Sequence, residues 1–131
     1  MRLAAAIKRY EKESNPHKRR LIAFDIARYL HDSNKVSREW LLRYAVDRLD
    51  GYDTHLSPFK SHLMVGAWMC CASCQEIEGK KFTLDEARNS MPLPQHNCQR
   101  EVNKAGFAIC LCDWEIDMHS VREARSLTLK T

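Results

Sequence analysis

The spacing of the cysteines is the feature that most constrains what this chain can fold into. Three of the six cysteines fall within MCCASC at residues 69–74, and two residues separate Cys71 from Cys74. Two thiolates at this spacing can reach one metal ion from a single tight turn. Further metal-ligand candidates follow later in the chain: His96, Cys98, Cys110 and Cys112.

These residues predict a closed zinc site. Structural zinc takes four Cys or His ligands in tetrahedral geometry, and one Cys-x-x-Cys pair with the later thiols supplies enough of them. We expect one Zn²⁺, held by four of five cysteines: Cys71, Cys74, Cys98, Cys110 and Cys112. His96 can substitute for one of them. Cys70, which follows Trp68 and Met69, fits a small buried apolar residue instead.

Two other interpretations of the cysteines compete with zinc. A thioredoxin-like redox pair requires a strand-to-helix junction in a βαβ setting, and it leaves the later cysteines without a role. Cysteines can also serve as small buried apolar side chains, which suits Cys70 but requires coincidence for the other five. The metal site accounts for more of the pattern than either alternative.

A family resemblance supports the zinc interpretation. Residues 70–113 contain Cys-x-x-Cys, Gly-Lys-x-Phe, a short predicted helix, Pro-x-Pro, a further cysteine and a late Cys-x-Cys. In this order of features the segment resembles the zinc-knuckle part of phage minor head (head-morphogenesis) proteins and related small bacterial and phage proteins. The segment departs from that pattern where His96-x-Cys98 is one residue short and where Gln99-Arg100 replaces Arg-Cys. These departures favour Cys110 and Cys112 over His96 as ligands.

Length and composition are typical of one globular domain. The 131 residues are 44% hydrophobic and 29% charged, which argues against disorder. No stretch reaches the roughly 18 apolar residues of a membrane span, and the segment after Met1 turns charged too early for a secretory signal. We therefore expect a cytoplasmic, reducing location without a membrane, in which the cysteines do not pair as disulfides.

The first part of the chain is expected to be helical. Apolar residues at helical spacing predict helices over 2–13 and 17–32. Ser37 is a good N-cap for a third helix, which we expect to stop at Gly51 before a loop over 52–58. Trp40, Leu41 and Tyr44 of the third helix are expected in the core or at an interface.

The second part is expected to contain a small β-element. The apolar run 62–70 favours a strand that leads into the cysteines, and Thr83 is a good cap for a helix over 84–90. Two further strands are predicted on either side of Ala105-Gly106, and a helix is predicted from Asp117. The sequence thus predicts an α+β fold in a single domain, with a basic helical part at 1–51 and a zinc-binding part, like a zinc knuckle or treble clef, at 62–117.

The positive charge is concentrated in the helical part. Residues 1–50 contain 12 Lys and Arg against 7 Asp and Glu, whereas residues 51–131 contain 9 against 10. Lys18, Arg19 and Arg20 form a cluster that can contact nucleic-acid phosphates without sequence preference. A solvated helix face is the simpler alternative. The segment from Ile26 to Leu49 also has the outline of a helix-turn-helix.

No catalytic motif accompanies the predicted metal site. None of the six histidines is followed two residues later by Glu, which excludes the deaminase signature, and His-Glu-x-x-His is absent. We expect a non-enzymatic, zinc-stabilised binding or adaptor module of phage or mobile-element type, with nucleic acid or a protein assembly as partner. The alternatives are a small metal-dependent nuclease using His96, His119 or Asp113, and a structural assembly subunit, as the resemblance implies.

Overall fold

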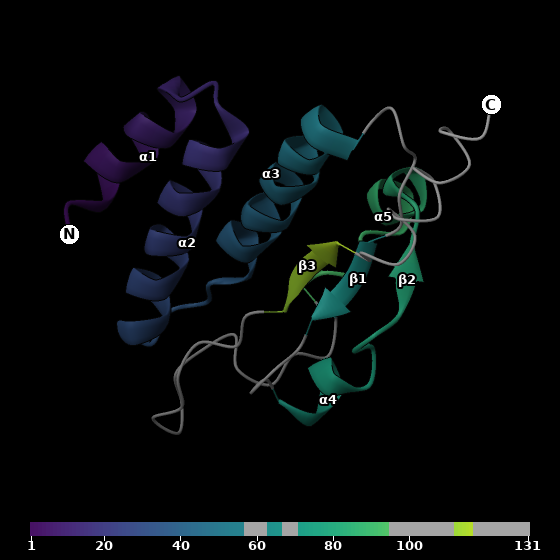
Figure 1. The fold of residues 1–131 in the computed structure, drawn as a ribbon. Coiled ribbons are helices and arrows are strands. Elements are labelled where there is room, and N and C mark those ends of the chain that lie inside the picture. The colour runs from purple at the N-terminus through teal and green to yellow at the C-terminus, as the bar shows by residue number, and fades with distance from the viewer. Residues whose placement is uncertain (57–62, 67–70, 95–111, 117–131) are drawn as a thin grey trace.

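The computed structural model describes residues 1–56, 63–66, 71–94 and 112–116. These residues form an α+β fold in which helices pack beside a small antiparallel sheet (Figure 1). The helices are α1 (Leu3–Lys12), α2 (Pro16–Asp32), α3 (Arg38–Leu56), α4 (Ala72–Gln75) and α5 (Leu84–Ser90). The strands are β1 (Leu63–Gly66), β2 (Lys81–Phe82) and β3 (Asp113–Ile116). The α+β class expected from the sequence is confirmed.

Strand β1 is the centre of the sheet, whose order is β2-β1-β3 with both pairings antiparallel. Leu63 lies opposite Phe82 on one side and Ile116 on the other, and Val65 lies opposite Trp114. Leu63, Val65 and Trp114 are almost fully buried, because alternate residues of a strand face the same side of the sheet. The predicted strand is thus confirmed over 63–66.

The α1–α2 hairpin forms as the sequence predicts. Asn15 ends the connection and caps α2, since its side chain accepts hydrogen bonds from the N–H groups of His17 and Lys18. Pro16 occupies the first position of the helix, where its missing N–H costs nothing. The buried residues of this hairpin pack on the first half of α3 in one core cluster: Ala6, Tyr10, Ala23, Ile26, Ala27, Trp40, Leu41 and Tyr44.

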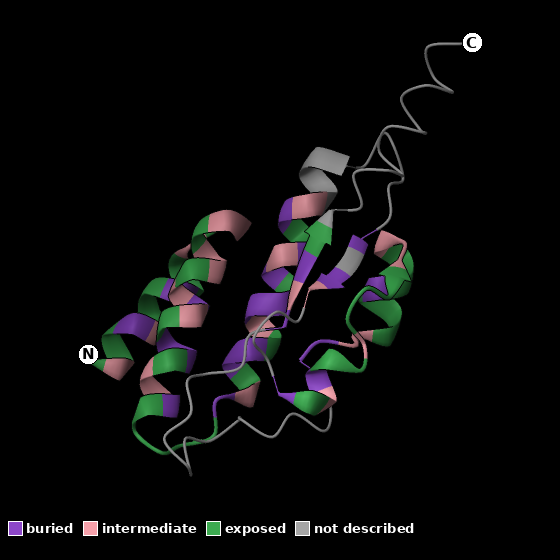
Figure 2. Cartoon of the chain, turned by 60° about the horizontal axis from the view of Figure 1, so that its bottom comes forward, coloured by how far each residue is buried: buried purple, intermediate pink, exposed green. Residues whose placement is uncertain are grey.

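Helix α3 is shared between two cores. Trp40, Leu41 and Tyr44 pack against α1 and α2, whereas Ala45 and Leu49 pack against the sheet and α5. Buried residues accordingly run along α3, which lies between the α1–α2 pair and the sheet (Figures 1 and 2). No described helix has the length and apolar character needed to cross a membrane.

The predicted end of the third helix at Gly51 is wrong. Helix α3 continues through Gly51 to Leu56, so the first residues of the expected 52–58 loop are helical. Tertiary contacts explain the extension, because Tyr52 hydrogen-bonds to the backbone of β3. Gly51 does not end the helix; it allows α3 to lie close to the His17 side chain of α2. A Cβ atom at position 51 would lie 2.9 Å from Cε1 of His17.

The short helix α5 begins as its sequence predicts. The Thr83 hydroxyl accepts a hydrogen bond from the Glu86 N–H, and the Glu86 side chain accepts one from the Thr83 N–H. The helix ends at Ser90, before Met91 in a left-handed conformation and the Pro-rich run. The predicted strand pair around Ala105-Gly106 and the helix from Asp117 lie outside the described residues.

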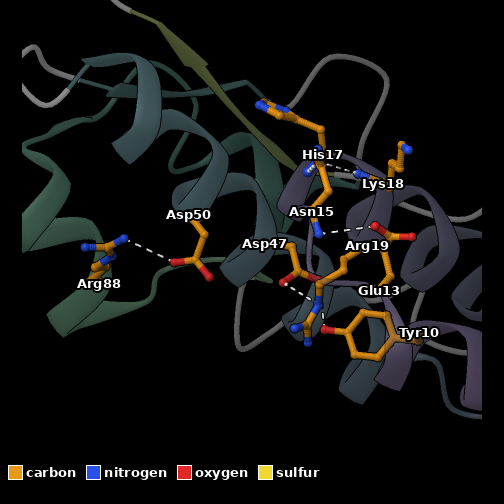
Figure 3. Close-up of polar contacts among 9 residues, drawn as sticks. All are labelled: Tyr10, Glu13, Asn15, His17, Lys18, Arg19, Asp47, Asp50 and Arg88. Atoms are coloured by element: carbon orange, nitrogen blue, oxygen red, sulfur yellow. Dashed lines mark hydrogen bonds and ion pairs between the residues drawn. The ribbon is translucent and has the colours of Figure 1, made fainter.

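A buried polar contact joins α1, α2 and α3. The Tyr10 hydroxyl donates to Asp47 Oδ2 over 2.8 Å, and Arg19 Nε lies 3.5 Å from Asp47 Oδ1 (Figure 3). The Arg19 guanidinium also stacks on the Tyr10 ring, at 4.5 Å from its centroid. Asp47 is only 3% exposed, and burial raises its pKa although Tyr10 and Arg19 act in the opposite direction. The Asp47 carboxylate therefore depends on both partners.

Removing the Tyr10 hydroxyl should destabilise the helical part. Tyr10→Phe leaves one oxygen of the buried Asp47 without its donor, so we expect a loss of about 1–3 kcal/mol in the free energy of unfolding. Urea unfolding at neutral pH, followed by circular dichroism, measures this loss. Tyr29→Phe removes a hydroxyl from half-buried Tyr29 outside the network and should cost less than about 0.5 kcal/mol. Equal losses for both variants would contradict the importance of this contact.

Candidate metal centre and basic surface

Cys71 and Cys74 lie together at the start of α4. Cys71 is the N-cap residue of this short helix, and its carbonyl accepts the Gln75 N–H over 3.0 Å. This turn brings the Cys71 and Cys74 sulfurs to 3.4 Å from each other. Both residues are buried, Cys71 at 4% and Cys74 at 0% exposure. The two thiols thus lie next to each other, as their spacing in the sequence predicts.

The distance between the sulfurs suits two ligands of one ion. It is much longer than the roughly 2.05 Å of a disulfide bond. Sulfurs at about 2.3 Å from zinc in tetrahedral geometry are separated by about 3.8 Å, which is close to the separation of Cys71 and Cys74. The burial of both thiols fits a structural role more closely than a catalytic one, because a catalytic metal site needs access for water.

Cys112 belongs to the same buried cluster as the pair. It is 8% exposed and packs in the core formed by α3, α5 and the sheet, which also contains Cys71 and Cys74. Cys98, Cys110 and His96 lie outside the described residues. In the described part of the chain, no three His, Cys, Asp or Glu residues are grouped so that they could hold a metal. The structure therefore brings together two of the predicted ligands and buries a third in the same core.

Hydrogen bonds to strand β1 hold the residues that follow Cys71 and Cys74 in the chain. The Val65 N–H donates to the Lys80 carbonyl over 3.0 Å, and the Gly79 N–H donates to the Val65 carbonyl over 2.8 Å. Gly79 adopts a φ of +81°, which a glycine tolerates without steric cost. Gly79 and Lys80, which follow the cysteine pair in the chain, are thus held by hydrogen bonds to Val65, which precedes it.

Three side chains of α3 bind β3, next to Cys112. Tyr44, Arg48 and Tyr52 follow one another at four-residue spacing and so share a helix face. Asp113 accepts hydrogen bonds from the Tyr44 hydroxyl at 2.9 Å and from Arg48 Nε at 3.1 Å. The Trp114 carbonyl accepts two more, from Arg48 at 3.1 Å and from the Tyr52 hydroxyl at 2.9 Å. We call this set of contacts the α3–β3 clamp.

The clamp changes the interpretation of Asp113. The sequence suggests a solvated strand end or, in the nuclease alternative, a catalytic carboxylate. In the structure the Asp113 side chain is 25% exposed and is held by Tyr44 and Arg48. Burial, and then the adjacent Asp113 carboxylate, raises the pKa of Tyr44 to about 12. Asp113 is therefore a structural partner of α3.

The three predicted phosphate-binding residues, Lys18, Arg19 and Arg20, differ in how far their side chains are exposed to solvent. Lys18 is exposed and points away from the Tyr10–Asp47 contact, whereas Arg19 is directed into it (Figure 3). Arg20 is half-buried, and its Nε atom is fully shielded from solvent. Lys18 is the one of the three that is exposed to solvent. The helix-turn-helix alternative is weakened in the same way, because Ser37 is fully buried and Arg38 donates to the Pro94 carbonyl.

The sequence interpretation missed a second basic set. Arg9 and Lys12 of α1 line an open groove together with Lys18 of α2. Arg9 and Lys12 are three residues apart, so the sequence alone indicates that they share a face of an amphipathic helix. That this face lies beside Lys18 of α2 follows only from the way the two helices pack.

Comparison with known proteins adds no family assignment: the sequence matches no family model, no curated protein and no solved structure at a significant level.

The α3–β3 clamp should produce a measurable alkaline effect. An unfolded Tyr loses its proton near pH 10, whereas folded Tyr44 keeps it until about pH 12. The folded state then binds more protons, so the free energy of unfolding falls as pH rises between these values, by at most about 1.4 kcal/mol per pH unit. Tyr44→Phe lacks this contribution and should show a shallower decline in urea titrations from pH 9 to 12. Parallel slopes for wild type and Tyr44→Phe would disprove the assignment.

Proposed function

We propose that the chain is a non-enzymatic binding or adaptor module whose β-element is clamped by one structural zinc. The observation that supports this most directly is the buried pair of Cys71 and Cys74, with sulfurs 3.4 Å apart. Cys112 in the same cluster and Cys98 and Cys110 elsewhere in the chain supply the remaining thiols, with His96 as a substitute. A small core gains folding energy directly from such a metal.

The proposed partner is nucleic acid or a protein assembly, reached through the basic helical part. The exposed Lys18 and the neighbouring cations of α1 support an anionic partner surface. The resemblance of residues 70–113 to phage head-morphogenesis proteins supports a phage-type or mobile-element role, including that of a structural assembly subunit. The metal would then stabilise the fold, and the helices would supply the contacts.

Zinc binding is tested on the purified chain in a reducing buffer. Native mass spectrometry should show one zinc per chain, and Cys71→Ser or Cys74→Ser should release it and unfold the C-terminal half, because two of four ligands come from this turn. Cys70→Ser is the matched control and should retain the metal. A folded, metal-free wild-type monomer in reductant would show that the cysteines are ordinary core residues.

The nuclease alternative receives no support from the described residues. Asp113 is engaged by α3, and a zinc bound mostly by thiolates has no open position at which to activate water. We expect the pure protein to hydrolyse neither DNA, RNA nor nucleotides with zinc, magnesium or manganese. Turnover that His96→Ala or His119→Ala abolishes, with circular dichroism unchanged, would establish the enzyme instead.

A further inference from the structure

The α1–α2 hairpin contains an open groove of about 520 Å³ on its outer side. The groove is lined from α1 by Arg9, Lys12 and Glu13, and from α2 by Lys18, Leu21 and Ile22. It lies away from the cysteine pair, on the helices at the opposite side of α3 from the sheet (Figure 1). The metal site therefore does not explain why this surface is hollow, apolar and basic together.

The rim of the groove is positively charged. Arg9, Lys12 and Lys18 form no ion pair or side-chain hydrogen bond with the rest of the described chain. The one anion, Glu13, already accepts the Asn15 N–H over 3.2 Å in the turn between the helices (Figure 3). Arg19, the adjacent cation, is directed inward to Asp47 and does not contribute to the rim. Three cations and one carboxylate leave the rim with a net positive charge, which attracts an anionic ligand.

The floor of the groove is apolar. Leu21 is 53% exposed, so its apolar side chain is available to a ligand in the groove. Ile22 beside it is half-buried. The hollow has room for one or two large side chains, and covering Leu21 with them would remove apolar surface from water. A ligand that fits both rim and floor must carry an apolar group between negative charges.

We propose that this groove binds an acidic amphipathic segment of a partner protein. An apolar side chain of that segment covers Leu21 and Ile22, and its Asp or Glu residues approach Arg9, Lys12 and Lys18. This is helix-in-groove recognition with charge complementarity at the rim. Nucleic acid fits less well, because its phosphates leave Leu21 in water and none of the described lining residues is aromatic and able to stack on a base.

The inference deepens the proposed function by naming the partner class, and its test does not depend on the metal. A display library of short random peptides is selected against the immobilised full-length chain at about physiological ionic strength. We expect enrichment of peptides in which large apolar residues alternate with Asp and Glu at helical spacing. The affinities of enriched peptides are then measured by fluorescence anisotropy for wild type and four variants.

Two variants alter the groove and two are matched controls. Leu21→Glu places a charge on the floor, and Val36→Glu makes the same change at a residue that is 61% exposed outside the groove. Lys18→Glu reverses the charge of a rim residue. Lys35→Glu is its control and makes the same charge reversal in the α2–α3 connection, outside the groove. We expect the groove variants to weaken peptide binding by roughly tenfold or more and the controls by less than about twofold. All four sites are exposed, so the thermal midpoints should stay near wild type.

Other occupants would overturn the proposal. If no acidic peptide is enriched, or if the enriched peptides bind all variants equally, the groove is not a peptide site. Binding of a DNA or RNA oligonucleotide that Lys18→Glu abolishes and the uncharged change Leu21→Asn leaves intact would assign the rim to phosphates. Concentration-dependent dimerisation in sedimentation velocity that Leu21→Glu abolishes would assign the groove to a second copy. Native mass spectrometry of the same sample separates a failure here from a failure of the zinc proposal.

Discussion

The hydrogen bonds from Tyr44, Arg48 and Tyr52 to β3 are the contacts on which the arrangement of this molecule depends. They join helix α3 to β3, the last described strand of the sheet. Each donor is partly buried, so a broken bond would leave a polar group away from water. The clamp therefore fixes where β3 lies, and with β3 the position of Cys112. A metal site that draws its ligands from distant segments needs such fixed supports.

Local chemistry made much of the fold predictable. Asn15 and Pro16 begin α2, Thr83 and Glu86 cap α5, and the apolar run before the cysteines forms β1. The prediction failed at Gly51, where a local stop signal competes with distant contacts. There α3 gains the packing of its second half and the Tyr52 hydrogen bond, and these outweigh the cost of one glycine inside a helix.

The candidate site was predictable only where its residues are neighbours in the chain. Cys71 and Cys74 are one turn apart, so their spacing alone brings the sulfurs together. The Tyr44–Asp113 contact spans 69 residues of sequence, and no local pattern indicates it. Arg19 shows the opposite case: its residue type suggested a phosphate contact, but the buried Asp47 on another helix determines where its charge is directed.

One consequence of the shared helix concerns communication across the chain. Since α3 supplies side chains to both cores, the two halves are thermodynamically linked through it. A ligand that rigidifies the sheet side restricts the motions open to α3, and α3 in turn restrains the hairpin that packs on it. Linkage is reciprocal, so a ligand that restrains the hairpin would act on the sheet side with the same coupling free energy. Helix α3 is thus the element whose side chains belong to both described cores.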